Sequence, residues 1–137
     1  MAVDVSFAYW TARGAGTVAK VPKGGGAAAI LATAQDKVAF IAVDASGVYW
    51  TRSADPDGSV WRSSLDGAVV VSLAADQHSP FGIALDGEAV YWTNAVAGGS
   101  VMKIAKWGRA GRANLTPPMS GSTTGVDLFL ESSHIKY

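Results

Sequence analysis

The amino-acid sequence predicts an all-β protein assembled from three copies of one supersecondary unit. A Tyr-Trp-Thr motif occurs three times, at residues 9–11, 49–51 and 91–93, with spacings of 40 and 42 residues. An apolar residue followed by Asp precedes each motif, and a Gly-(Ser/Thr)-Val triplet follows it. Short apolar and β-branched runs alternate with turn residues through each unit. About forty residues holding four short strands is typical of a β-propeller blade, a radially packed four-stranded antiparallel sheet.

Each unit divides into four strand signals, and the chain is expected to form one domain over residues 1–137. Blade 1, about 1–34, has strands predicted over 2–3, 7–11, 17–21 and 27–31. Blade 2, about 35–76, has strands predicted over 38–44, 48–51, 59–63 and 68–73. Blade 3, about 77–118, has strands predicted over 81–85, 89–93, 100–104 and 112–115. Residues 119–137 are expected to be a C-terminal closing strand or remnant. By propensity Gly25–Ala34 favours a helix, but its register with the valine-rich 68–74 predicts a strand.

The repeated residues are expected to be structural. Alternation along a strand sends Tyr and Trp of each motif to opposite faces, so each blade offers an aromatic ring to both neighbours. Three aspartates, Asp4, Asp44 and Asp86, recur with the blades and are expected to cap turns. Three cations, Lys20, Arg62 and Lys103, recur two residues after the valines and are expected to lie on an exposed face of the third strand.

Composition excludes several function classes. The 11 basic and 11 acidic residues give a net charge of zero, which argues against a nucleic-acid or anionic-membrane footprint. There is no cysteine, which excludes disulfides and thiolate metal sites. No apolar run approaches the length of a membrane span, so no membrane insertion is expected. The N-terminus as given has no signal-peptide pattern, and the sequence does not indicate the cellular compartment.

The repeat pattern resembles the YWTD-type propellers of the low-density-lipoprotein receptor class and their bacterial relatives near the NHL repeats. The resemblance covers about residues 2–116. It implies a propeller of six blades, and a secreted or extracytoplasmic protein if a leader has been removed. The fourth motif residue, Asp in that family, is here Ala12, Arg52 and Asn94. Of these only Asn94 could replace the hydrogen bonds of the aspartate.

Three blades and a remnant are half of such a ring. One hypothesis is that two copies of the chain close a six-bladed ring with twofold symmetry, because an open half-ring exposes two apolar blade faces. In that arrangement the segment 125–130 would complete the first blade of the partner chain. The alternative is that the chain is a piece of a longer propeller.

No catalytic or metal-binding pattern stands out, so no catalytic residue, metal or cofactor is expected. The two histidines have no second ligand at metal spacing, and no Gly-x-Ser-x-Gly elbow is present. The candidate ligand-binding residues either break the repeat or lie in loops that share one face of a propeller. They are Trp61, Arg62, Trp107, Arg52, Asn94 and His78. The alternative for the two tryptophans is packing against a neighbouring blade.

The leading functional prediction is a non-enzymatic binding scaffold that takes a protein or peptide on one face of an assembled ring. One alternative is a lectin with glycan sites between blades, in which Trp61 and Arg62 would be the first suspects. A second alternative is a fragment of a propeller enzyme, a lyase or hydrolase.

Overall fold

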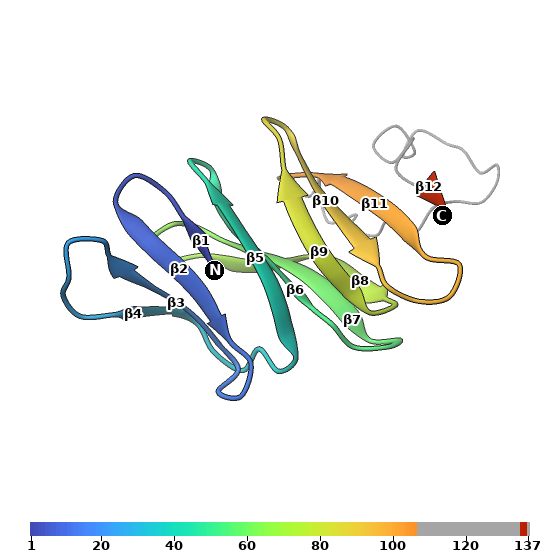
Figure 1. Ribbon diagram of the computed structural model, residues 1–137, viewed down its shortest axis with the longest axis horizontal. Helices are drawn as coiled ribbons and strands as arrows, with labels where there is room; N and C mark the ends of the chain where they lie inside the picture. The colour runs from blue at the N-terminus through green and yellow to red at the C-terminus, as the bar shows by residue number, and fades with distance from the viewer. Residues whose placement is uncertain (107–134, 137) are drawn as a thin grey trace.

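Three four-stranded antiparallel sheets follow one another along the chain in the computed structural model, which describes residues 1–106 and the backbone of 135–136 (Figure 1). Blade 1 contains β1 (Ala2–Val3), β2 (Phe7–Ala12), β3 (Thr17–Pro22) and β4 (Ala29–Ala32). Blade 2 contains β5 (Val38–Asp44), β6 (Gly47–Arg52), β7 (Gly58–Ser63) and β8 (Val70–Gln77). Blade 3 contains β9 (Pro80–Leu85), β10 (Ala89–Asn94), β11 (Ser100–Ala105) and β12 (Ile135–Lys136). The all-β, blade-like prediction is confirmed.

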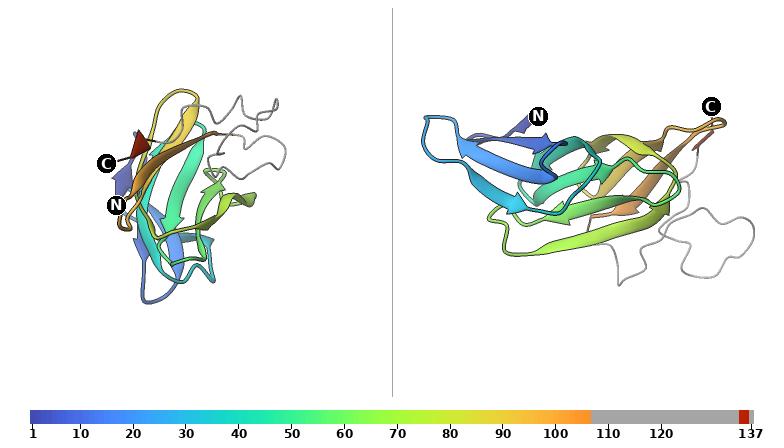
Figure 2. Two further views of the ribbon diagram at one scale, coloured as in Figure 1. Left: turned by 90° about the vertical axis from the view of Figure 1, so that its right-hand side faces the viewer. Right: turned by 90° about the horizontal axis from the view of Figure 1, so that it is seen from below.

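The strands of each sheet are paired in chain order, and neighbouring sheets meet along their inner strands. β1 lies beside β5, and β5 lies beside β9, while the second strand of each blade packs on the first strand of the next (Figures 1 and 2). The segment that propensity alone would make helical contains β4, as the repeat predicted. The predicted fourth strand of blade 3, residues 112–115, lies outside the described residues. So do the proposed closing segment 125–130 and nearly all of the remnant 119–137. The outer edge of β11 pairs instead with β12.

The fourth strand of blade 2 differs from its prediction over 68–73. The turn is longer than the two residues Asp66-Gly67, because the Asp66 carboxylate accepts hydrogen bonds from the Ser64 hydroxyl and from the backbone N–H of Ala68. The strand therefore begins later, at Val70. It continues to Gln77, which pairs with Gly58.

Aromatic residues of the motif fill the interfaces between blades. Tyr9 of blade 1 and Trp50 of blade 2 belong to one buried cluster, and Tyr49 and Trp92 belong to the next. All four are at most 1% exposed. The predicted division of Tyr and Trp between opposite faces is confirmed, and each interface joins the Tyr of one blade to the Trp of the following blade.

The motif threonines add polar contacts between blades. The Thr51 hydroxyl is fully buried, donates to the carbonyl of Phe81 in blade 3 at 2.9 Å, and accepts the N–H of Phe40 in its own blade at 3.2 Å. Thr11 donates to the carbonyl of Ala39 in blade 2 at 3.4 Å. These hydroxyls satisfy backbone groups that β-bulges free from the sheet ladder.

Two glutamines anchor the tryptophans. The Oε1 atom of Gln35 accepts the indole N–H of Trp50 at 3.0 Å, and that of Gln77 accepts the indole N–H of Trp92 at 3.2 Å. Both glutamines are buried. Their repeat therefore has a packing cause, since an indole N–H buried between sheets needs an acceptor.

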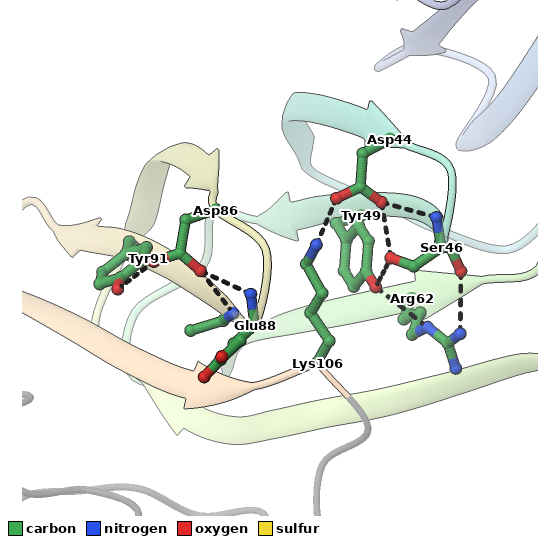
Figure 3. A network of polar contacts seen from close by, with 9 residues as sticks. Asp44, Ser46, Tyr49, Arg62, Asp86, Glu88, Tyr91 and Lys106 are labelled. Atoms are coloured by element: carbon green, nitrogen blue, oxygen red, sulfur yellow. Dashed lines mark hydrogen bonds and ion pairs between the residues drawn. The ribbon is translucent and has the colours of Figure 1, made fainter.

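The repeated aspartates cap hairpin turns, as predicted. Oδ1 of Asp86 accepts the N–H groups of Glu88 and Ala89, and Oδ2 accepts the hydroxyl of Tyr91 at 2.7 Å (Figure 3). The backbone N–H of Glu88, the Tyr91 hydroxyl and the backbone N–H of Ala89 together lower the pKa of Asp86 to about 2. Asp4 makes the same set of contacts in blade 1.

Candidate functional site

One edge of the blades gathers the loops that precede the first strands and follow the second strands. We call it the loop edge; it comprises residues 33–37, 52–58, 77–80 and 94–99. Contacts between these loops hold it together: Arg52 pairs with Asp36, and Nδ1 of His78 lies 2.6 Å from Oδ1 of Asp55. The prediction that these loop sets share one face is confirmed. The opposite end, the aspartate edge, comprises the turns 4–6, 44–46, 64–69 and 86–88.

Arg52 is the centre of a polar chain at the loop edge. Its guanidinium pairs with the carboxylate of Asp36, donates to the Asp36 carbonyl at 3.1 Å, and donates to Oγ of Ser59 at 3.4 Å. Ser59 Oγ also accepts the indole N–H of Trp61 at 2.8 Å. The structure thus connects two predicted site residues, Arg52 and Trp61, through one hydroxyl.

Trp61 is half-buried and packs between blades 1 and 2. Its ring stacks on Trp50 with a centroid separation of 6.5 Å and an interplanar angle of 10°. It lies against the buried cluster that contains Tyr9 and Trp50. This is the packing alternative considered for the sequence, and ligand binding by Trp61 stays a prediction.

His78 and Asp55 form an exposed hydrogen-bonded pair where blades 2 and 3 meet. Both side chains are more than half exposed, at 58% and 52%. His78 occupies the repeat position that Asp36 holds one blade earlier, 42 residues before it. The same point on the scaffold therefore carries an acid in one blade and an imidazole in the next.

Asn94 lies beside this pair and holds a buried acceptor without a partner. Its Nδ2 donates to Oε1 of Gln77 at 3.1 Å, while its Oδ1 has no hydrogen-bond partner among the described residues. An unpaired buried carbonyl costs free energy, which a bound water donor at this point would recover. Gln77 itself is the buried last residue of β8.

An exposed aromatic pair lies on the inner strands next to the loop edge. The rings of Phe40 on β5 and Phe81 on β9 meet edge-to-face with centroids 4.6 Å apart, and the residues are 44% and 42% exposed. Each lies within two residues of a strand position paired with Arg52 or Asn94. Sequence reasoning missed this pair because the two phenylalanines hold different repeat positions, and only the packing of β5 on β9 joins them.

The remaining predicted site residues lie elsewhere. Arg62 is at the aspartate edge, where its guanidinium donates to the Tyr49 hydroxyl at 3.2 Å and to the Ser46 carbonyl at 2.9 Å (Figure 3). Trp107 lies outside the described residues. The expectation that the third-strand cations lie on an exposed face is wrong, because Lys20, Arg62 and Lys103 are all half-buried. Lys20 donates to the Leu65 carbonyl of the next blade, and Arg62 donates within its own blade.

Within residues 1–106 no group of three or more His, Asp or Glu side chains is placed to hold a metal ion. The described part of the chain also contains no helix long and apolar enough to cross a membrane. The loop edge offers charged and amide groups around an apolar centre, which is an arrangement suited to binding.

Comparisons with known proteins support the fold. No family model matches the sequence, and no curated protein matches it. A chain in the crystal structure of a nidogen/laminin complex matches the structure with a TM-score of 0.54 and 16% sequence identity. The match covers 76% of this chain and spans 57% of the length of the other. The likeness is one of fold, a β-propeller arrangement of the YWTD type.

Proposed function

We propose that the protein is a non-enzymatic binding scaffold whose loop edge takes a protein or peptide partner. The observation that carries this proposal is the exposed Phe40–Phe81 pair with polar side chains around it. Protein interfaces combine an apolar, aromatic centre with a polar rim, and the centre supplies most of the affinity. Arg52, His78 and Asn94 form the rim.

A partner peptide would use the groups that the chain leaves available. Its apolar side chain would cover the two phenylalanine rings, and its polar groups would meet His78 and Asp55, whose side chains are more than half exposed. The matched chain belongs to a complex of nidogen with laminin, so a propeller of this fold occurs in a protein–protein assembly. That supports a protein partner over a glycan.

Selection of a displayed peptide library against the 137-residue chain tests the proposal. Selected peptides should lose at least tenfold in affinity for Phe81→Ala, because an interface centre is worth about 1.4 kcal/mol or more. They should keep their affinity for Val71→Ala, a matched change at an exposed apolar residue on the outer strand β8. Equal binding to both variants would contradict the proposal. A glycan-array signal that Trp61→Ala abolishes would support the lectin alternative instead.

We further propose that two copies of the chain complete a six-bladed, YWTD-type ring. Tyr91, Thr93 and Val101 line an open cavity of about 210 Å³ on blade 3. They hold the repeat positions of the blade 1 residues, Tyr9, Thr11 and Val18, on the face that packs against Trp50. Blade 1 carries the corresponding tryptophan, Trp10, on its other face and half-buried.

A second copy would seat Trp10 in the blade 3 cavity as Trp50 and Trp92 are seated within the chain. Light scattering should give twice the chain mass of 14.1 kDa. Trp10→Ala should shift the mass toward the monomer, and Phe40→Ala should not. A monomer at all concentrations, or a dimer indifferent to Trp10→Ala, would contradict this assembly.

A further inference from the structure

A groove at the aspartate edge between blades 1 and 2 differs from its counterpart between blades 2 and 3. The groove has a volume of about 520 Å³, and its walls include Val5, Phe7 and Leu65 beside the carboxylate of Asp4. The counterpart contains the same aspartate, Asp44. There, however, a side chain of the protein itself reaches that carboxylate.

The occupant of the second groove is Lys106. Its residue is 4% exposed, and its ammonium pairs with Oδ2 of Asp44, 62 residues away in the sequence (Figure 3). Burial raises the pKa of Asp44, but the hydrogen bonds from Lys106 and Ser46 outweigh it and leave the pKa lowered. The second groove therefore accommodates a lysine side chain, with its aliphatic stem buried and its ammonium on the aspartate.

The first groove has the equivalent aspartate, Asp4, but no lysine of the chain at the position of Lys106. Lys106 comes three residues after the third-strand cation Lys103. In blade 2 the equivalent cation is Arg62, and the residue three positions after it is Leu65. A leucine cannot reach the carboxylate. Asp4 accordingly keeps only the Ser6 and Phe7 N–H groups on Oδ1 and the Tyr9 hydroxyl on Oδ2. Each carboxylate oxygen accepts about two hydrogen bonds, so Oδ2 can take a further donor.

The charge balance of the first groove permits a bound cation. The backbone N–H of Phe7 and the Tyr9 hydroxyl lower the pKa of Asp4, which keeps it ionised. The Lys20 ammonium is engaged across the groove, on the Leu65 carbonyl at 2.7 Å and over the Phe7 ring at 4.3 Å. Arg62 holds the equivalent position in the second groove and coexists there with Lys106.

We propose that the groove between blades 1 and 2 binds a lysine side chain of a partner protein, with its ammonium on Asp4. The site lies on the opposite edge from the peptide surface of the loop edge, so the two proposals stand or fall separately. One partly exposed ammonium–carboxylate contact with an apolar stem corresponds to a Kd on the order of millimolar.

Titration of the full chain with N-acetyl-lysine methylamide, followed by the ¹⁵N-resolved amide signals of Ser6 and Phe7, tests the proposal. We expect saturable shifts with this compound and none with the norleucine analogue, which has the stem without the charge. Asp4→Asn should weaken binding about fivefold, the effect of losing about 1 kcal/mol, while Asp86→Asn, the equivalent change in blade 3, should leave it unchanged.

Two exchanges of the groove residue keep the test independent of folding defects in the Asp4 variant. Leu65→Lys should fill the groove from within and abolish the shifts. Lys106→Leu should open the second groove and add saturable shifts at the Ser46 amide. The absence of saturable shifts in the wild-type chain, or binding that survives Leu65→Lys, would overturn the proposal.

Discussion

Replacing Thr51 by valine isolates the polar contact between blades 2 and 3. Valine has nearly the shape of threonine, so the change removes a hydroxyl without opening a cavity. That hydroxyl is fully buried and serves two backbone groups, the Phe81 carbonyl at 2.9 Å and the Phe40 N–H at 3.2 Å. Each buried group left without a partner costs about 1–3 kcal/mol. We therefore expect the free energy of unfolding to fall by about 2–6 kcal/mol.

The equivalent threonines of the other blades are matched controls. Thr11 makes one long contact of 3.4 Å and is half-buried, so Thr11→Val should cost about 0.5–1 kcal/mol. The Thr93 hydroxyl accepts one N–H, from Gly82 of its own blade at 3.2 Å, so Thr93→Val should also cost about 1 kcal/mol. Only Thr51→Val combines complete burial with a bond in each direction.

Thermal unfolding followed by circular dichroism at one fixed protein concentration gives the comparison. For a chain of this size, about 3 kcal/mol corresponds to a Tm lower by roughly 8–16 °C, against a few degrees for the controls. If Thr51→Val lowered the Tm no more than Thr11→Val, the hydroxyl would not stabilise the blade interface.

Three further predictions follow from the same geometry. Gly58→Ala should lower the Tm strongly, because a Cβ would lie 2.2 Å from a proline ring carbon and 2.7 Å from two carbonyl oxygens. A Cβ at Gly14 meets nothing within 4 Å, so Gly14→Ala should leave the Tm unchanged, and similar Tm values for the two variants would contradict this packing. Gln77→Leu should cost more stability in urea unfolding than Gln35→Leu, because Gln77 accepts two donors and Gln35 one; the reverse order would refute it. The pKa of Asp86 is lowered from 3.8 to about 2, so its contribution to the free energy of unfolding is present above pH 4 and lost as the pH falls toward 2. Asp86→Asn should therefore flatten the pH dependence of the stability measured in urea between pH 4 and pH 2, and an unchanged pH dependence would refute this.

The sequence was sufficient to predict the blades because their causes repeat. Alternation put Tyr49 and Trp50 on opposite faces, and the turn-capping role of Asp86 followed from its recurrence with the hairpin. Local chemistry and periodicity specify such features without knowledge of the neighbouring blade. The segment containing β4 shows the same logic, since the repeat correctly overrode helix propensity.

The sequence could not predict contacts that depend on how one blade lies against another. Gln77 is a buried acceptor for the Trp92 indole, and no sequence signal marks that role, because the depth of that indole between sheets is a tertiary property. The Phe40–Phe81 pair and the contact of Lys106 with Asp44 join residues from different blades at different repeat positions. Such pairs have no sequence period, so a search for periodicity passes over them.

Differences between equivalent positions are stronger functional evidence in a repeat protein than the repeated residues themselves. The fold needs the same tyrosine, tryptophan and aspartate in each blade, so their recurrence has a structural cause. The fold does not require Leu65 where the next blade has Lys106, since the third strands that precede these residues, β7 and β11, pair with the second strands of their blades in the same register. One aspartate is satisfied by a lysine of the chain, and the other faces an open groove. Because the strands leading to the two sites are equivalent, the exchanged side chain determines whether the carboxylate is paired from within the chain or left open to a partner.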